Sequence, residues 1–561
     1  MVDFTWRVGG EAGYGIATAG HLFARMCMNH GLNVFGSREY PSLIRGGHNT
    51  FSIRFSDKPL TSQSMYCDLI AALNENTIWE EKDDLRKGGV IIHDDEVKPR
   101  VKGDYKLIPV KLNEIAGKHG DAKIMMNTVA IGVSAGMLNF DKKACTDVIK
   151  RVFKKKKKVI KPNIKAFLEG YELGVKHQIM KVSKKKKLKK MLVNGNTAFA
   201  IGALRAGCNF ISAYPMTPAT SILEYLCLKA EEYGVRAVQA EDEISAINDA
   251  LGASFAGARA MTCTSGGGFA LMNEGISLAG MSEAPVVIAL AQRPGPATGL
   301  PTRTGQGDLL FAINAGHGEF TRVVMAPGDV KECYSMALKA FNLADNYQTP
   351  VIILLDKHLS VSVNSVKRFT DSYKVNRGKL VTKGRKVKEG HRFKRYEYTK
   401  DGVSPRPVPG LKGLTYCFAG DEHDEEGFIV EASDKANLIA EKRLRKHKTI
   451  KKELGRGFKI HGKGKNTLMA WGSTKGAIIE AQKILEEKGF DTQFIQVKIL
   501  APLNVNEIKK AVKGQLIIIE NNRDGQLTHL LGGLDFKQIN KYDGRPLHPE
   551  EIADKVGRML K

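Results

Sequence analysis

The chain has 561 residues, of which 42% are hydrophobic and 26% charged, and this composition is typical of a globular protein with about three or four domains. No apolar run approaches the roughly 20 residues that a membrane span needs, and the first residues lack the pattern of a signal peptide, so we expect a soluble cytoplasmic protein. The formal net charge of +26 comes from lysine-rich runs without patterned aromatic residues, which argues against nucleic-acid binding.

The eight cysteines are scattered along the chain, and no two of them form a C-x-x-C pair. This spacing argues against an iron–sulfur cluster or a structural zinc site built by this chain alone, and we predict no metal ligands here. The apolar surroundings of Cys208, Cys227 and Cys263 predict buried, reduced thiols. The lysine runs indicate solvated linkers or a surface that attracts acidic partners.

The first predicted domain begins with a strand over residues 4–8, followed by a glycine-rich turn and a helix. The glycines of this turn are Gly9, Gly10, Gly13 and Gly15. A second glycine-rich turn carries Arg38, Arg45, Gly46 and Gly47. Because backbone N–H groups point outward at a helix N-terminus, such a turn can bind a phosphate. A purely structural role for both turns is the alternative.

The second predicted domain extends from about residue 194 to residue 366. Short strand-like runs alternate there with helical patterns, which is typical of a parallel, doubly wound sheet. The predicted strands are 209–213, 236–240, 260–264, 285–291, 321–326 and 350–356.

The remainder of the chain falls into two parts. Residues 375–450 are highly charged, and we predict irregular structure for them. The last domain, from about residue 457, alternates again between strands and helices. Its predicted strands are 467–472, 494–499 and 515–522, and a helix passes through Ile484 and Leu485.

The stretch from residue 212 to residue 308 contains four polar or glycine-rich segments, each at or just after a predicted strand. An open α/β sheet places its ligand sites at the carboxyl ends of its strands, so these segments predict one binding surface. In the first segment, Pro218 suits the first position of a helix and Thr217 its N-cap. The functional alternative is that the Thr217 hydroxyl contacts a substrate oxo group or carboxylate.

The second and third segments each allow two explanations. Three acids at residues 241–243 begin a predicted helix, where the helix dipole favours them; one of them could instead serve a cofactor. The third segment has three consecutive glycines, which indicate either the close approach of a ligand or a plain flexible turn. They are Gly266, Gly267 and Gly268.

The fourth segment, residues 292–308, is dense in proline and glycine. A long loop of this kind within a compact domain is usually functional. Arg293 and Arg303 are its candidates for binding an anion, since a guanidinium group binds a carboxylate through two hydrogen bonds. Solvated surface arginines are the alternative.

Several motifs together resemble those of the 2-oxoacid:ferredoxin oxidoreductases. Y-P-M-T-P at 214–218 is similar to the Y-P-I-T-P motif of that family, and the segments 292–309 and 354–360 resemble its α subunit. G-G-E-A-G-Y-G at 9–15 and Y-P-S-L-I-R-G-G at 40–47 resemble its γ domain, fused here ahead of the α part. The likeness covers nearly the whole chain.

This resemblance implies a thiamine diphosphate enzyme and gives a role to each candidate residue. Glu243 would hydrogen-bond the N1′ atom of the aminopyrimidine, and Thr217 would contact an oxygen of the substrate. Arg293 would pair with the substrate carboxylate, with Arg303 as the second candidate. Tyr214 would also line the substrate site. The remaining cofactor-binding residues would be Pro215, Gly266, Gly267 and Gly268.

The resemblance also implies partners. The chain lacks the G-D-G motif and the cysteine set of the family, so Mg²⁺ and the iron–sulfur cluster are expected on a β subunit that shares the thiamine diphosphate. A heterodimer or a dimer of heterodimers, with ferredoxin as electron acceptor, would follow. CoA would be the co-substrate. Residues that could bind it in the γ domain are Gly10, Gly13, Gly15, Arg45, Gly46 and Gly47.

We therefore predict a multidomain α/β fold. It would comprise a γ domain (1–185), a doubly wound pyrimidine-binding domain (190–370), a charged linker (371–456) and a transketolase C-terminal-like domain (457–561). The predicted activity is oxidative decarboxylation of a 2-oxoacid with CoA, with 2-oxoglutarate as the first candidate and pyruvate as the second. The alternatives are branched-chain or indolepyruvate specificity within the same class, or a non-catalytic phosphate-binding, CoA-binding or scaffold subunit.

Overall fold

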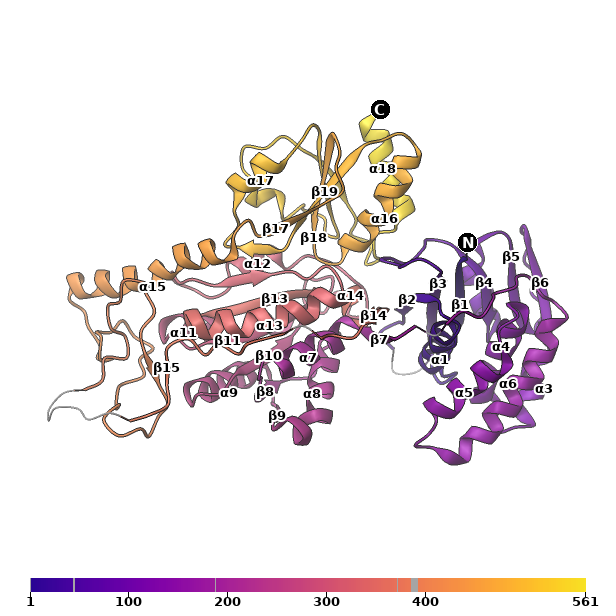
Figure 1. Ribbon diagram of the computed structural model, residues 1–561, viewed down its shortest axis with the longest axis horizontal. Helices are drawn as coiled ribbons and strands as arrows, with labels where there is room; N and C mark the ends of the chain where they lie inside the picture. Colours follow the sequence, from indigo (N-terminus) through magenta and orange to yellow (C-terminus); the bar gives the residue numbers. More distant parts are fainter. Residues whose placement is uncertain (1, 44–45, 187, 371, 385–391) are drawn as a thin grey trace. The chain divides into compact units, whose positions relative to one another are not determined.

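The computed structural model describes residues 2–43, 46–186, 188–370, 372–384 and 392–561. It is an α/β protein with several sheets, as the sequence predicts (Figure 1). The chain divides into two compact units. The first contains Met1–Val193, Val361–Arg368 and His548–Ile552, and the second contains Asn194–Ser360, Phe369–Leu547 and Ala553–Lys561. The division into four segments stays a prediction.

In the described part of the first unit, eight strands form one mixed sheet in the order β6-β5-β4-β1-β3-β2-β14-β7. The central strand β1 (Asp3–Glu11) pairs antiparallel with β3 (His48–Ser56) and parallel with β4 (Cys67–Ala72). The other strands are β2 (Asn33–Glu39), β5 (Leu85–Asp94), β6 (Tyr105–Val110), β7 (Lys190–Asn194) and β14 (Val363–Lys367).

The helices of this unit pack around that sheet. They are α1 (Ile16–Asn29), α2 (Glu75–Glu81), α3 (Leu112–Gly117), α4 (Ala122–Met137), α5 (Lys142–Val152) and α6 (Ile160–Val175), with short 3₁₀ turns η1 (Lys82–Asp84) and η2 (Lys157–Val159). The side chains of Asn74, Asp121 and Asp141 accept backbone N–H groups in the first turns of α2, α4 and α5, which fixes where these helices begin.

The first glycine-rich turn is shorter than predicted. Gly9 and Gly10 belong to β1, because the pairing of β1 with β3 continues as far as Glu11, so their assignment to a turn is wrong. Gly13 and Gly15 do form the turn before α1, with φ angles of 99° and 69° that glycine adopts without strain.

The second glycine-rich turn is described only in part. Gly46 and Gly47 have φ angles of 73° and 74°. Arg45 lies outside the described residues.

The second unit contains the predicted doubly wound sheet, in the order β20-β12-β13-β11-β10-β8-β9. Its strands are β8 (Phe210–Ala213), β9 (Arg236–Gln239), β10 (Ala260–Thr264), β11 (Val286–Gln292), β12 (Val323–Met325), β13 (Pro350–Asp356) and β20 (Ile499–Ala501). All are parallel except β20. The six strands predicted for this domain are therefore confirmed, although β9 and β12 are shorter than predicted.

Two groups of helices contact this sheet, α7, α8 and α13 on the one hand and α9, α10 and α11 on the other. The helices of this region are α7 (Gly195–Arg205), α8 (Thr220–Tyr233), α9 (Glu243–Phe255), α10 (Gly266–Leu271), α11 (Asn273–Met281), α12 (Leu309–Ile313), α13 (Val330–Tyr347) and α14 (Lys357–Val361).

The last part of the chain forms a five-stranded sheet in the order β17-β19-β18-β21-β22. Its strands are β17 (Phe458–His461), β18 (Asn466–Trp471), β19 (Thr492–Val497), β21 (Leu516–Glu520) and β22 (Lys537–Asn540). The helical segments are α16 (Thr474–Glu487), α17 (Val505–Ala511), η3 (Thr528–Leu530) and α18 (Pro549–Leu560). The predicted strands and the helix through Ile484 and Leu485 are confirmed.

The charged region is more regular than predicted. It contains a short pair of strands, β15 (Leu380–Val381) and β16 (Arg406–Pro407), and the 22-residue helix α15 (Ser433–Leu454). The prediction of irregular structure is wrong for α15, because buried cations such as Lys442 and Lys446 occupy positions on its inner face where a hydrophobic pattern would have marked a helix.

Burial of the cysteines follows the prediction with one exception. Cys208 and Cys263 are buried, whereas Cys227 is exposed on α8, whose inner face is formed by other residues. Among the described helices, none is both long and apolar enough to cross a membrane.

Candidate active site

The four segments between residues 212 and 308 lie at the carboxyl ends of β8, β9, β10 and β11, as predicted. In the sheet, β9 and β10 flank β8 on opposite sides. The chain therefore changes direction across the sheet next to β8, and open α/β sheets bind ligands at such a switch point. This topology brings the first, third and fourth segments to neighbouring strand ends.

Glu243 is a buried carboxylate at the start of α9. Asp242 is the N-cap, and its side chain accepts the Ser245 N–H at 2.8 Å. The helix start is thus already capped, and the Glu243 side chain is not needed there. Glu243 is only 3% exposed, and its Oε1 atom is buried without a hydrogen-bond partner among the described residues. Such an atom is costly unless a ligand completes it.

Burial also changes the ionisation of Glu243. Loss of solvent raises the pKa of Glu243 above its ordinary value, and the charge of Asp242 raises it further, against hydrogen bonds from the Glu243 backbone and the Thr264 side chain that lower it. A buried carboxyl group with a raised pKa is a candidate for proton exchange with a ligand.

The glycine segment lies directly against this carboxylate. A Cβ atom on Gly268 would overlap with Glu243 Oε1 and with Thr264 Oγ1, whereas one on Gly267 would meet only the Ala297 carbonyl oxygen, at an ordinary contact distance of 3.9 Å. All three glycines have negative φ angles within α10, so the turn does not need glycine for its backbone conformation. Gly268 is required instead for the close approach of Glu243.

Thr217 and Arg293 lie together. The Arg293 Nη1 atom donates to the Thr217 carbonyl oxygen at 2.7 Å, and Arg293 Nε is buried with no hydrogen-bond partner among the residues that the structure describes. Burial lowers the pKa of Arg293, partly offset by the charge of Asp308. Thr217 is not the N-cap that the sequence suggests. The Ala219 and Thr220 N–H groups bond to the Met216 carbonyl, and this turn delays the start of α8 to Thr220.

Asp308 is a site residue that the sequence reasoning does not single out. It ends the proline- and glycine-rich loop, and its Oδ2 atom is buried and accepts no hydrogen bond from any described residue. Its carboxylate oxygens lie 2.9 and 3.0 Å from the position of a Cβ on Gly266. Burial raises the pKa of Asp308 to about 6, against the opposing charge of Arg293. In the sequence, an aspartate at this point is indistinguishable from a helix cap.

Arg303 lies on another part of the same loop. Its Cβ packs near Gly544, and the neighbouring Thr304 N–H donates to the Gly544 carbonyl at 3.0 Å. Gln306 is also hydrogen-bonded to the last domain. Its Nε2 atom donates to the Trp471 carbonyl, its Oε1 atom accepts the Asn521 N–H, and its backbone N–H donates to the Asn521 carbonyl. The structure thus brings Arg293, not Arg303, to Thr217.

Tyr214 and Pro215 lie between β8 and Thr217. Tyr214 is 40% exposed, and Pro215 is half-buried. Asn196 fixes the residues that follow this segment: its Nδ2 atom donates to the Pro218 carbonyl at 2.7 Å and to Ser221 Oγ at 2.9 Å. Asn196 is a second supporting residue that sequence reasoning misses, since it follows an unrelated strand.

The turn before α1 in the first unit carries a cation beside it. Lys123 Nζ lies 4.9 Å from the centre of the Tyr14 ring and 3.8 Å from the position of a Cβ on Gly13. Asn127 fixes the turn by donating to the Tyr14 carbonyl at 2.7 Å. Backbone N–H groups and an ammonium group therefore lie close together at this helix N-terminus.

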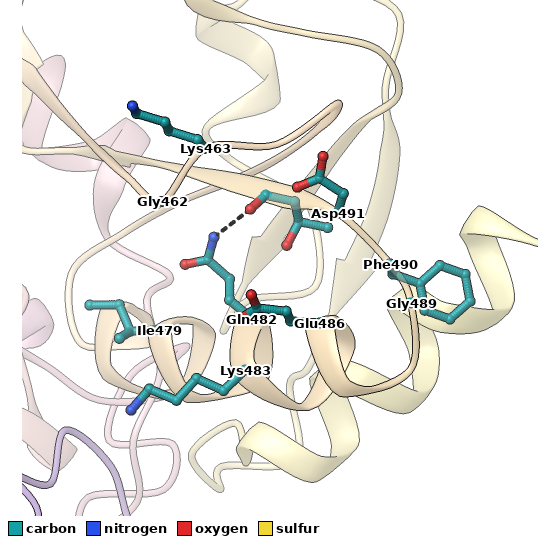
Figure 2. Close-up of a pocket in the computed structure, with 10 residues that line it drawn as sticks. Gly462, Lys463, Ile479, Gln482, Lys483, Glu486, Gly489, Phe490 and Asp491 are labelled. Carbon is teal, nitrogen blue, oxygen red and sulfur yellow. Dashed lines mark hydrogen bonds between the residues drawn. The ribbon is translucent and has the colours of Figure 1, made fainter.

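A further pocket, of about 530 Å³, lies in the last domain (Figure 2). Figure 2 shows Gln482, Lys483 and Glu486 of α16 along one side, and Gln482 donates to the Thr492 carbonyl at 2.9 Å. None of the predicted site residues lines it. Among the described residues, no group of three or more histidine, cysteine, aspartate or glutamate side chains is arranged to hold a metal ion.

Comparison with protein-family models matches residues 201–442 to "Pyruvate flavodoxin/ferredoxin oxidoreductase, thiamine diP-bdg". Residues 5–173 match "Pyruvate ferredoxin/flavodoxin oxidoreductase". The first match contains the four segments described above, and the second contains both glycine-rich turns.

Two similar proteins carry names of the same class of oxidoreductase subunit. The 2-oxoacid:ferredoxin oxidoreductase subunit alpha of Sulfolobus sp is 34% identical, over 99% of this chain and 97% of the relative. The 2-oxoglutarate synthase subunit KorA of Methanothermobacter thermautotrophicus is 31% identical, over 65% of this chain and 98% of its own length.

A solved structure matches along the full length. It is a 2-oxoglutarate:ferredoxin oxidoreductase from Magnetococcus marinus with 2-oxoglutarate, coenzyme A and succinyl-CoA bound. The two chains are 31% identical, cover each other completely and superpose with a TM-score of 0.91.

Proposed function

Because the chain belongs to the 2-oxoacid:ferredoxin oxidoreductases, as an α subunit with a fused γ-type domain, we propose that its candidate active site binds thiamine diphosphate and a 2-oxoacid. The reaction of this class is the oxidative decarboxylation of the 2-oxoacid with CoA, which gives an acyl-CoA and CO₂ and passes electrons to ferredoxin.

The observation that carries this proposal is the buried Oε1 atom of Glu243, which has no hydrogen-bond partner among the described residues and lies against Gly268. A carboxyl group with a raised pKa can share a proton with the N1′ atom of an aminopyrimidine. These residues therefore fit the pyrimidine end of thiamine diphosphate, which, when bound, supplies an electron sink for decarboxylation.

The other residues of the site suit the substrate. Arg293 offers a buried guanidinium Nε donor, which fits a carboxylate. Thr217 is held beside it by the Arg293 hydrogen bond and would present its hydroxyl to the oxo group. Tyr214 would line the entrance, since it is exposed. Pro215, Gly266 and Gly267 would contact the cofactor.

We propose 2-oxoglutarate as the substrate, with pyruvate as the second candidate. The support is the full-length similarity to the Magnetococcus marinus enzyme, in which 2-oxoglutarate and succinyl-CoA are bound, and to a 2-oxoglutarate synthase subunit. Substrate preference is measured directly by comparing kcat/KM for the two acids, and a higher value for pyruvate would reverse the assignment.

The active enzyme would be a complex with a β subunit. That subunit would supply Mg²⁺, the iron–sulfur cluster and the remaining part of the thiamine diphosphate site. In the γ-type domain, the turn that contains Gly13 and Gly15 would bind a phosphate group of CoA, supported by the neighbouring Lys123. Gly10, Gly46 and Gly47 would belong to the same surface.

The test is the reconstituted complex with the variant Glu243→Gln. Glutamine keeps the size of the side chain but cannot share a proton with the pyrimidine, so the 2-oxoacid-dependent reduction of a viologen dye should fall by about 10²- to 10⁴-fold. Glu241→Gln is the matched control, because Glu241 is exposed two residues earlier in the chain.

Two results would contradict the proposal. One is full activity of the Glu243→Gln complex, which would exclude the cofactor role of this residue. The other is a wild-type complex that binds CoA but shows no 2-oxoacid-dependent dye reduction, as expected for a non-catalytic scaffold. The isolated chain should show neither dye reduction nor the brown absorbance of an iron–sulfur cluster.

A further inference from the structure

Two buried polar atoms of oppositely charged groups in the candidate active site have no hydrogen-bond partner in the part of the chain that the structure describes: Arg293 Nε and Asp308 Oδ2. They come from the two ends of the loop that follows β11. The Asp308 N–H donates to Gln292 Oε1 at 3.0 Å, and Gln292 Nε2 donates to the Leu355 carbonyl of β13 at 3.0 Å. Both ends of the loop are therefore fixed to the sheet, and the positions of Arg293 and Asp308 are set by buried hydrogen bonds.

The Asp308 carboxylate is directed toward the glycine turn. Asp308 precedes α12, but its side chain makes no capping hydrogen bond to that helix. Its two oxygens instead lie 2.9 and 3.0 Å from where a Cβ on Gly266 would stand. Since Gly268, two residues later, contacts Glu243, the Asp308 and Glu243 carboxyl groups lie at the two ends of one glycine turn.

The charged and titratable neighbours of Asp308 are few. Burial favours the neutral form and raises the pKa of Asp308 to about 6, while the charge of Arg293, the residue after β11, favours the ionised form. Gln292 and Gln526 are uncharged neighbours on the backbone side. Glu243 lies beyond the glycine turn. The carboxyl group of Asp308 therefore changes its charge near neutral pH.

We propose that Asp308 is a substrate-binding residue that acts in its neutral form. The protonated carboxyl donates a hydrogen bond to a carboxylate oxygen of the 2-oxoacid, which Arg293 binds from the other side. Ionised Asp308 repels that carboxylate and competes with it for Arg293. This assignment rests on the proposed function of the site.

The sign of the pH effect follows from these two states. The carboxylates of a 2-oxoacid are ionised throughout the range considered, so the protein residue alone determines the change. Below the pKa of about 6, Asp308 is neutral and the substrate binds tightly. Above this pKa, the neutral fraction of Asp308 falls by about tenfold for each pH unit. KM should therefore rise by up to about tenfold per pH unit.

The experiment measures KM and kcat for the 2-oxoacid with the reconstituted complex, from about pH 5.5 to about pH 8.5. In the wild type, we expect KM to rise with pH while kcat changes little. Asp308→Asn keeps the size and a donor group but cannot ionise. It should keep a low KM at all pH values, so that the ratio of variant to wild-type KM falls with rising pH. Asp535→Asn, at an exposed position of the last domain, is the matched control.

A second measurement does not depend on turnover. Infrared difference spectra of the complex between pH values below and above 6 should contain the carbonyl stretch of a protonated carboxylic acid. Asp308→Asn should remove this band. Calorimetry of 2-oxoacid binding without CoA should give a dissociation constant with the same pH dependence as KM.

The outcomes separate the two proposals. An active complex whose KM is independent of pH, or in which Asp308→Asn keeps the wild-type slope, overturns the role of Asp308 and leaves the proposed function intact. A complex without 2-oxoacid-dependent activity at any pH overturns the proposed function and this assignment with it.

Discussion

At the scale of single residues, the position of the Glu243 carboxylate depends on a glycine. Gly268 contacts Glu243 so closely that any side chain would displace it. The sequence identifies three consecutive glycines but does not show which of them matters. The structure distinguishes them, because a Cβ on Gly268 would overlap with Glu243 and one on Gly266 would crowd Asp308, whereas one on Gly267 would make only an ordinary contact.

We predict that Gly268→Ala impairs cofactor binding. The added methyl group overlaps with Glu243 Oε1 and Thr264 Oγ1, so the carboxylate must move away from its position. The affinity of the complex for thiamine diphosphate, measured by titration of the cofactor-free enzyme, should fall by about tenfold or more, equivalent to about 1.4 kcal/mol.

The control for this variant is Gly252→Ala. Gly252 lies on α9, the helix that carries Glu243, and a Cβ atom there would meet no heavy atom within 4 Å. Alanine at this position should leave cofactor affinity unchanged and stabilise the helix by about 0.5–1 kcal/mol. Equal cofactor affinity in both variants would show that Gly268 does not position Glu243.

The sequence does not determine which of the two arginines of the loop lies at the candidate site. Both have the chemistry of a carboxylate binder, and their order along the chain favours Arg293 only weakly. Tertiary contacts separate them, because Arg293 donates to Thr217 whereas the Arg303 segment packs near Gly544. Asp308 was not predicted at all, since its role depends on burial beside Gly266.

At the scale of secondary-structure elements, the buried face of α15 combines ion pairs with the apolar residues Ile439, Ile450 and Leu454. Lys442 and Lys446 both pair with Glu283, which precedes β11, and all three side chains are buried. Burial opposes the ionisation of Glu283, but the two ammonium groups outweigh it and hold the pKa of Glu283 well below its ordinary range. This arrangement explains why a lysine-rich segment forms a helix on the surface of a folded domain.

We predict that Glu283→Gln strongly destabilises this region. Glutamine keeps the volume but leaves two buried ammonium groups without a counter-charge, which typically costs about 3–5 kcal/mol. The midpoint of thermal unfolding of the complex should fall accordingly. Glu441→Gln, at an exposed position of the same helix, should change stability by less than about 0.5 kcal/mol. Equal midpoints for the two variants would refute the structural role of the buried cluster.

At the scale of the whole molecule, the candidate sites for the two substrates belong to different compact units. Thr217, Glu243 and Arg293 lie in the second unit, and the turn beside Lys123 lies in the first. Substitutions in one unit should therefore affect the binding of one substrate without the other.

We predict that Lys123→Ala raises KM for CoA and leaves KM for the 2-oxoacid unchanged. Loss of one ammonium group from a phosphate typically costs about 1.5–3 kcal/mol, so KM for CoA should rise by about tenfold or more. Steady-state kinetics of the complex with each substrate varied in turn checks this. Lys165→Ala, at an exposed position of α6, is the control. An unchanged KM for CoA would favour a purely structural role of the turn.

The sequence by itself determined the strands of the doubly wound sheet, the family and the segments that form the site. It could do so because these features are local: a short apolar run bounded by turn residues favours a strand, and a motif is recognised by its order of residues. The tertiary structure alone showed that, among the described residues, the Oε1 atom of Glu243 has no hydrogen-bond partner, that Gly268 rather than Gly267 contacts it, and that Asp308 lies beside Gly266. It also showed that Lys442 and Lys446 lie on the buried face of α15. These facts depend on burial and on contacts between residues distant in the sequence, which no local pattern contains.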